Sequence, residues 1–297
     1  MHSVLLHIVT GKGGTGKTTL SCVLGLGYAE YGKRTLVVSI DFAQNIDDVL
    51  NVKLGEEPKK IVDNLYAVRI DIDREVCRYI DYVCDKLSTV FPQWSVYNVD
   101  KYLTILKNMP GIEEHVIINK LTQLIENLQN FDVIVIDTPP TGVAARLITL
   151  PETMTRWLER LIQFRMDIVK LRASLRREPS EDPILNILKE DFCRFSKVSS
   201  LIKSHSKITI VTTLEKLPIL EAARIVKMLR EFNLNVHSIV FNKCAEDMHI
   251  EDFVKIILQD VNYHNIRIIK VPKLEYEPQG LDKLRTMLNY VNDIITS

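Results

Sequence analysis

The sequence predicts an α/β protein with a mostly parallel sheet that is flanked by helices and carries helical insertions. Three observations predict this class. Strand-like and helix-like stretches alternate along the chain, which is typical of parallel βαβ units. Most strand-like runs are continuously apolar, as in strands that are buried on both faces. The chain has 297 residues, of which 46% are hydrophobic, so it is long enough to bury a sizeable core.

The first βαβ unit lies near the start of the chain. Residues 4–9 form a strand-like run, residues 17–30 an amphipathic helical stretch, and residues 35–40 a second strand-like run. The later strand-like runs are residues 65–72, 131–136, 208–212, 236–241 and 266–271. Joined by right-handed crossovers, these runs predict one sheet of seven strands.

Two stretches between the strands are too long for single crossover helices. Residues 73–128 place apolar side chains such as Val76 and Ile80 at helical spacing. Residues 151–202 carry apolar side chains on more than one face of a helix. We therefore expect a single domain over residues 1–297, with these two stretches as helical insertions.

Charge and cysteine usage exclude several classes of function. Thirty-eight basic and thirty-eight acidic residues give a formal net charge of zero. No overall field therefore draws the chain to nucleic acid, and we expect no nucleic-acid partner. The cysteines are odd in number, five, and no two form a C-x-x-C pair. These two observations argue against a disulfide framework and a zinc knuckle, and they favour a reducing, cytoplasmic compartment.

A glycine-rich segment between the first strand-like run and the first helix fits the phosphate-binding pattern G-x-x-x-x-G-K-[ST]. Its glycines let backbone N–H groups and the helix N-terminus face phosphate groups. Lys17 would neutralise the β and γ oxygens of a nucleoside triphosphate, and Thr18 would bind Mg²⁺. The alternative is a glycine-rich turn without a ligand. The predicted binding residues here are Gly11, Lys12, Gly13, Gly14, Thr15, Gly16, Lys17, Thr18 and Thr19.

Two aspartates directly follow strand-like runs. Asp41 follows residues 35–40, and Asp137 follows residues 131–136. Parallel strands end at one edge of the sheet, where doubly wound folds bind ligands, so we expect both carboxylates at that edge. Each aspartate could also cap the helix that follows it, and capping does not exclude a catalytic role.

The phosphate-binding loop contains a second lysine, Lys12, and so has the deviant form K-G-G-T-G-K-T. Residues 41–48 read D-F-A-Q-N-I-D-D, and residues 137–142 read D-T-P-P-T-G. With these segments the chain resembles the ArsA/Get family of P-loop ATPases over nearly its whole length. This family includes arsenite pump ATPases and cytosolic targeting factors for tail-anchored membrane proteins. The resemblance implies a P-loop NTPase sheet and ATP hydrolysis.

The resemblance also implies roles for individual residues. Lys12 would reach across a homodimer to the partner's nucleotide and act on transition-state charge, as an arginine finger does. Asp41 would position or deprotonate the attacking water, and Asp137 would support Mg²⁺. Asn242 and Pro272 match the adenine-binding positions. The implied cofactors are ATP and Mg²⁺, and the implied catalytic residues are Asp41, Lys12 and Lys17.

The implied partners follow from the targeting ATPases. In these proteins, insertions like residues 73–128 and 151–202 form a groove for a hydrophobic client, such as the transmembrane segment of a tail-anchored protein. We therefore expect a nucleotide-gated homodimer with a client-binding subdomain and a membrane receptor. The alternative is that these apolar side chains only face a core. The candidate groove residues are Met154, Leu158, Leu161 and Met166.

Several positions depart from the family's pattern. Phe42 and Gln44 stand where the family usually has proline and histidine, which predicts slow turnover, and Val143 replaces another histidine. Only Cys244 lies where targeting factors carry a C-x-x-C zinc pair, which argues against a zinc-tethered dimer. A nucleotide-gated adaptor or scaffold with little hydrolysis is therefore an alternative function.

A third function is the motor subunit of an arsenite efflux pump. Such a pump would use three cysteines, because thiolates are soft ligands. Cys77 and Cys84 are seven residues apart and would share a helical face. We favour the interpretation that both are small core residues.

Overall fold

The computed structural model describes residues 4–40, 45–90, 109, 111–127, 130–176, 182–245, 248–258 and 265–296. The chain divides into two compact units. The first unit comprises Met1–Asp71, Asn127–Arg146 and Ile202–Ser297, and the second comprises Ile72–Glu126 and Leu147–Leu201.

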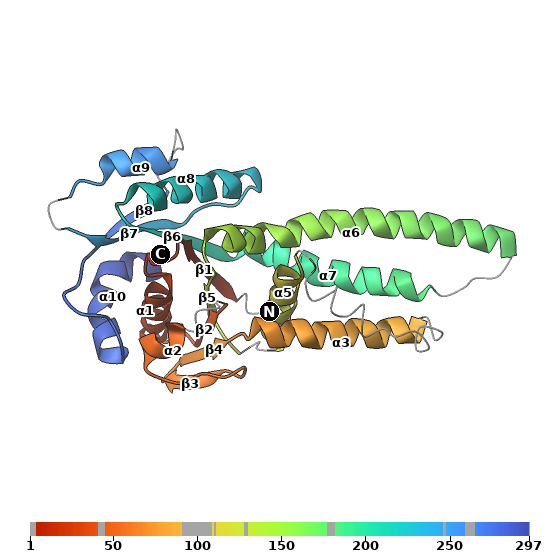
Figure 1. Cartoon of the computed structure of the whole chain (residues 1–297), viewed down its shortest axis with the longest axis horizontal. Coiled ribbons are helices and arrows are strands. Elements are labelled where there is room, and N and C mark those ends of the chain that lie inside the picture. The colour runs from red at the N-terminus through yellow and green to blue at the C-terminus, as the bar shows by residue number, and fades with distance from the viewer. Residues whose placement is uncertain are drawn as a thin grey trace. The chain divides into compact units, whose positions relative to one another are not determined.

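The first unit contains an eight-stranded sheet with the strand order β3-β4-β2-β5-β1-β6-β7-β8 (Figure 1). Neighbouring strands are parallel except for β3 and β4. The predicted α/β class with a mostly parallel sheet is thus confirmed. The strands are β1 (Leu5–Gly11), β2 (Thr35–Ser39), β3 (Lys59–Val62), β4 (Leu65–Arg69), β5 (Val133–Asp137), β6 (Ser206–Thr212), β7 (Ser238–Cys244) and β8 (Arg267–Pro272).

Strand β3 is the strand of this sheet that was not predicted from the sequence. It has four residues, runs antiparallel to β4, and lies at the edge of the sheet. Lys59 and Lys60 are exposed, as is common for edge strands, which carry charge to avoid pairing with other chains. A short strand with exposed lysines has no apolar run by which it could be recognised.

The helices of the first unit cover both faces of its sheet. They are α1 (Lys17–Glu30), α2 (Asn45–Leu50), α8 (Lys216–Glu231), α9 (Glu251–Leu258) and α10 (Leu281–Ile295). Helices α1 and α10 lie side by side, and so do α8 and α9 (Figure 1). The connection from β1 to β2 runs one way along the sheet and those from β6 to β8 run the other way, so right-handed crossovers place α1 and α8 on opposite faces.

Helix α1 is buried on nearly every side, and two glycines allow this close packing. A Cβ atom at Gly25 would lie 2.3 Å from Val37 Cγ2 on strand β2. A Cβ atom at Gly27 would lie 2.2 Å from Ile295 Cδ1 and 2.9 Å from Leu288 Cδ2 on α10. The glycines therefore let α1 approach the sheet and α10 at once, which fixes the helix that follows the phosphate-binding loop.

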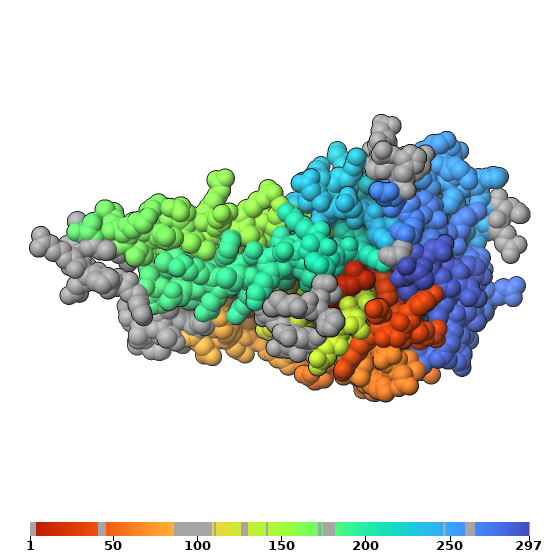
Figure 2. Space-filling model, turned by 180° about the vertical axis from the view of Figure 1, so that it is seen from behind, coloured from red at the N-terminus to blue at the C-terminus, as the bar shows by residue number. Residues whose placement is uncertain are grey.

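The second unit is helical. It contains α3 (Ile72–Val90), α5 (Ile112–Asn127), α7 (Pro183–Ser204) and most of α6 (Thr141–Arg176). Helices α6 and α7 lie side by side (Figures 1 and 2), and an ion pair of 2.9 Å joins Arg165 Nη2 to Asp182 Oδ2. None of the helices within the described ranges is long and apolar enough to cross a membrane.

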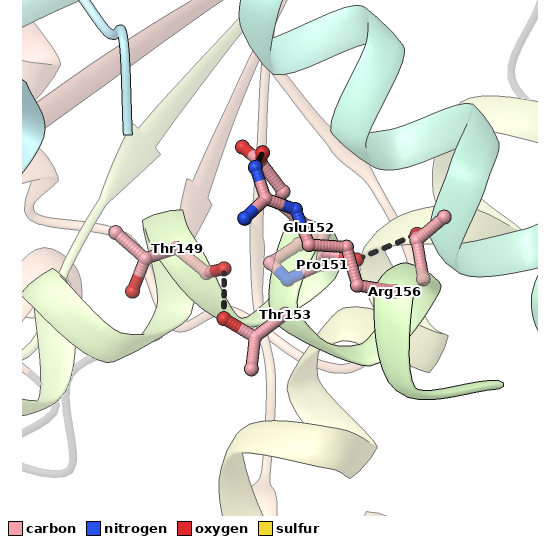
Figure 3. A network of polar contacts seen from close by, with 6 residues as sticks. Thr149, Pro151, Glu152, Thr153 and Arg156 are labelled. Carbon is pink, nitrogen blue, oxygen red and sulfur yellow. Dashed lines mark hydrogen bonds and ion pairs between the residues drawn. The ribbon is translucent and has the colours of Figure 1, made fainter. Parts of the chain in front are cut away.

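Helix α6 continues through a proline. Pro151 has no N–H to donate within the helix, and its ring crowds the carbonyl one turn earlier. Side chains of the same turn make further bonds (Figure 3): Thr153 Oγ1 donates to the Thr149 carbonyl at 3.3 Å, and Arg156 pairs with Glu152. The helix that carries the second insertion therefore begins at residue 141 and passes Pro151 without ending.

Candidate functional site

The phosphate-binding loop joins β1 to α1 at the point where the strand order changes direction. Gly14 and Gly16 have φ angles of 79° and 96°, which L side chains rarely adopt. A Cβ atom at Gly16 would also lie 2.3 Å from Asn242 Nδ2. Gly13 and Gly14 are exposed, so the backbone of the loop is open to a ligand.

The carbonyl oxygen of Lys12 organises the loop. It accepts hydrogen bonds from the backbone N–H of Thr15 at 3.4 Å, from Thr15 Oγ1 at 2.8 Å and from Lys17 Nζ at 3.3 Å. Lys17 is only 5% exposed although its side chain is charged, so its ammonium group lies inside the loop. Thr18 and Thr19 are half-buried in the first turn of α1.

Asp137 lies at the end of β5, between β1 and β2 in the sheet. Its carboxylate is fully buried and accepts hydrogen bonds from Ser21 Oγ on α1 and Ser39 Oγ on β2, both at 3.4 Å. A buried carboxylate requires such partners or a cation. The structure thus places Asp137 at the carboxyl end of β5, beside the point where β1 continues into the loop. Its polar neighbours Ser21 and Ser39 were not predicted from the sequence.

Asn242 and Lys243 extend the loop's contacts to β7. Asn242 Nδ2 donates to the Thr15 carbonyl at 2.8 Å, and Lys243 Nζ donates to the Gly14 carbonyl at 3.0 Å. Lys243 has a φ angle of 58°, which is uncommon for a residue with a side chain. Asn242 was predicted at the site from the sequence, whereas Lys243 was not. A lysine directly after Asn242 was the only signal for it.

Pro272 lies at the end of β8, opposite Cys244 of β7. The N–H of the following residue, Lys273, donates to the Cys244 carbonyl at 2.9 Å. Pro272 of β8 is therefore paired with the residue that lies two positions after Asn242 on β7. Asp41 lies outside the described residues, as do Phe42 and Gln44.

The cysteines do not form a cluster. In the part of the chain that the structure describes, no group of three or more His, Cys, Asp or Glu side chains could hold a metal ion. Cys77 is exposed and Cys84 is half-buried, so the expectation that both are core residues was wrong for Cys77. Cys244 is buried, and burial raises the pKa of its thiol.

The candidate groove residues on α6 differ in exposure. Leu158 is only 2% exposed and belongs to the core of the second unit, so it cannot line a groove. Met154, Leu161 and Met166 are half-buried. The structure instead shows an apolar line along α6, with Trp157 54% exposed, Phe164 65% and Leu171 63%. With the half-buried Leu161 and Ile168 between them, these residues form what we call the α6 stripe: Trp157, Leu161, Phe164, Ile168 and Leu171.

This fold and loop define a P-loop nucleotide-binding protein, because a buried parallel strand leads through a glycine-rich loop into a helix N-terminus. The chain belongs to the anion-transporting ATPase family, whose model matches residues 4–293. It is therefore an ATPase that binds ATP, which confirms the family and the enzyme class that the sequence predicted.

Several relatives align over nearly the whole chain. "Putative arsenical pump-driving ATPase 2" of Aquifex aeolicus is 30% identical over 95% of this chain and 97% of the relative. "ATPase ASNA1 homolog 1" of Paramecium tetraurelia is 28% identical over 93% of this chain and 89% of the relative. "ATPase ASNA1 homolog" of Entamoeba dispar is 27% identical over 93% and 90%. The chain is thus similar both to proteins named for arsenical pumps and to ASNA1 homologues.

Proposed function

We propose that this ATPase works as a nucleotide-gated homodimer in the cytoplasm and binds a hydrophobic client, the transmembrane segment of a tail-anchored protein, on its helical unit. A membrane receptor would then accept the client. The single observation that carries the client assignment is the α6 stripe, because it exposes large apolar side chains along one line of a helix.

The nucleotide chemistry is assigned to the loop and its neighbours. Backbone N–H groups of residues 13–17 and the N-terminus of α1 would bind the phosphates. Lys17 already places its ammonium group within the loop, where it would meet the β and γ oxygens. Lys12 would act in trans on the partner's nucleotide, and Asp41 would orient the attacking water. Asn242 and Pro272 would hold adenine at the ends of β7 and β8.

Mg²⁺ fits the oxygen atoms present at the loop. Thr18 offers a hydroxyl at the start of α1, and Asp137 offers a buried carboxylate held by two hydroxyl donors. Mg²⁺ binds through few protein oxygens together with water and substrate phosphates, so this small set suits it. When bound, the ion would neutralise charge that develops on the phosphates.

The α6 stripe supplies the client surface. Its residues follow a spacing of four and three, so they lie on one side of the helix. A transmembrane helix of about 20 apolar residues exposes far more apolar surface than a protein in water tolerates. A carrier therefore needs an apolar surface of its own, and large side chains such as Trp157 and Phe164 provide it.

The motor subunit of an arsenite pump is the second candidate, because the Aquifex aeolicus relative is named for an arsenical pump. Thiolates would bind the metalloid. Against this function, the described residues contain no cluster of three or more potential ligands. The two candidates differ in what they bind, so one experiment can separate them.

The test is co-expression with a protein that has a single C-terminal transmembrane helix, followed by purification in Mg-ATP. We expect the wild type to retain this client and Phe164→Glu to lower the retained amount about tenfold, because a buried charge in an apolar interface is costly. ATP hydrolysis should be unchanged in Phe164→Glu. Gln163→Glu is the matched control, since it adds the same charge at an exposed neighbouring position outside the stripe.

Lys17→Ala should abolish ATP hydrolysis and show whether capture depends on nucleotide. The proposal fails if the double variant Phe164→Glu, Leu171→Glu retains as much client as the wild type. It also fails if the wild type captures no client in any nucleotide state. Acceleration of ATP hydrolysis by arsenite in that case would establish the pump motor instead.

A further inference from the structure

Asn242, near the carboxyl end of β7, contacts the phosphate-binding loop itself. Strand β6 separates β7 from β1, which leads into the loop, so the contact joins strands that are not neighbours in the sheet (Figure 1). Asn242 Nδ2 donates to the Thr15 carbonyl at 2.8 Å, and a Cβ atom at Gly16 would lie 2.3 Å from the same nitrogen. The amide therefore lies directly against the loop, at a position where glycine leaves room for it.

Both ends of the Asn242 amide are hydrogen-bonded. While Nδ2 donates to Thr15, Oδ1 accepts from the backbone N–H of Lys243 at 2.9 Å. Turning the amide over would place its oxygen against the Thr15 carbonyl and its NH₂ group against the Lys243 N–H, so neither bond could form. The two contacts therefore fix the orientation of the side chain, with its donor toward the loop.

The contact with Thr15 orients one peptide group of the loop. The peptide bond between Thr15 and Gly16 is trans, so its C=O and N–H groups point in opposite directions. Because Asn242 holds the Thr15 carbonyl, the N–H of Gly16 points away from the Asn242 side chain. This N–H has no partner among the residues that the structure describes. Backbone N–H groups of such loops bind phosphate oxygens.

We propose that Asn242 is a positioning residue of the phosphate-binding loop, and that it sets the affinity for a polyphosphate whether or not a base is attached. This role adds to the proposed contact with adenine, because the amide has a second N–H and further lone pairs to offer. The inference rests on the proposed binding of phosphates by the loop. A single side chain then serves both the base and the phosphates.

The test is titration calorimetry on the full chain with Mg²⁺ and two probes, a non-hydrolysable ATP analogue and inorganic tripolyphosphate, which has no base. We expect Asn242→Ala to raise the Kd of tripolyphosphate about three- to tenfold, as the loss of one hydrogen bond implies. The Kd of the ATP analogue should rise by at least the same factor. Asn289→Ala is the matched control, because it removes the same side chain at an exposed position on α10, and it should change neither value.

The proposal is overturned if Asn242→Ala binds tripolyphosphate as tightly as the wild type does. Weaker binding of the ATP analogue alone would then assign Asn242 to the base. A lower melting temperature with both Kd values unchanged would leave Asn242 with a role in the fold only. If Asn242→Ala does not fold, Asn242→Ser replaces it and the same criterion applies to tripolyphosphate.

The wild type separates this inference from the function on which it rests. Binding of the ATP analogue without binding of tripolyphosphate at about 10 mM would contradict the inference alone, because the loop would then hold no polyphosphate without a base. Binding of neither probe would refute the proposed role of the loop, and this inference with it.

Discussion

Helices α1 and α6 are both rich in apolar residues, yet these residues differ in burial between the two helices. In α1 the apolar side chains are buried on all sides, because the sheet and α10 both pack against that helix. In α6, Leu158 is buried while its neighbour Trp157 is 54% exposed. Helix α1 therefore buries its apolar side chains in a core, whereas α6 keeps some of its own at the surface. Apolar content alone therefore does not determine whether a helix is buried.

The largest expected effect is a change in the free energy of unfolding, compared between a side chain of α1 and one of α6. Leu24→Ala in α1 removes a fully buried side chain and should lower the free energy of unfolding by about 2–5 kcal/mol. Phe164→Ala on the α6 stripe should change it by less than about 0.5 kcal/mol, because the ring is 65% exposed. Urea unfolding of both variants measures the two values. An equal loss in both would mean that Phe164 is part of a core.

The phosphate-binding loop and α1 were predicted at the correct residues, because local signals determine them. Glycines, a lysine and a helix start lie within a few positions, and the helix over residues 17–30 has the bounds that its pattern predicted. The contact between Lys243 and Gly14 was not predictable, since 229 residues separate them. The exposure of Trp157 was also not predictable, because it depends on which helices pack beside α6.

The second expected effect concerns one histidine in each unit, the buried His7 and the half-buried His115. His7 is fully buried and hydrogen-bonded to Tyr28 Oη at 3.0 Å and Thr209 Oγ1 at 2.7 Å. Burial, and then the charges of His237 and Lys207, lowers the pKa of His7 well below its usual value. In the second unit, burial and Arg194 lower the pKa of His115 to about 4.

These shifts make stability fall as the pH falls. Below about pH 6.5 the unfolded chain binds a proton on each histidine while the folded chain does not, so the unfolded state is favoured. For His115 this loss develops between about pH 6.5 and pH 4, and at pH 5 it amounts to at most about 2 kcal/mol. His115→Phe should remove this share of the pH dependence and leave the contribution of His7 in place.

Urea unfolding at pH 7 and pH 5 measures the effect. The phenyl ring matches the aromatic neighbours Tyr79 and Phe195, which limits other changes in stability. If His115→Phe keeps the full pH dependence of the wild type, the imidazole is not held neutral in the second unit.

The smallest expected effect concerns Lys243, which would act on the nucleotide site by positioning the loop. Lys243→Met removes the hydrogen bond from Nζ to the Gly14 carbonyl and keeps a side chain of similar length. A hydrogen bond of this kind contributes about 0.5–1.5 kcal/mol, so KM for ATP should rise about two- to tenfold while kcat stays near the wild-type value. Lys243→Arg should restore the wild-type KM, since it keeps a cationic donor.

Lys255→Met, at an exposed position on α9, is the control and should change neither constant. A lower kcat with an unchanged KM would show that Lys243 acts on the chemical step, and a lowered melting temperature in Lys243→Met would show that it only stabilises the fold of the first unit.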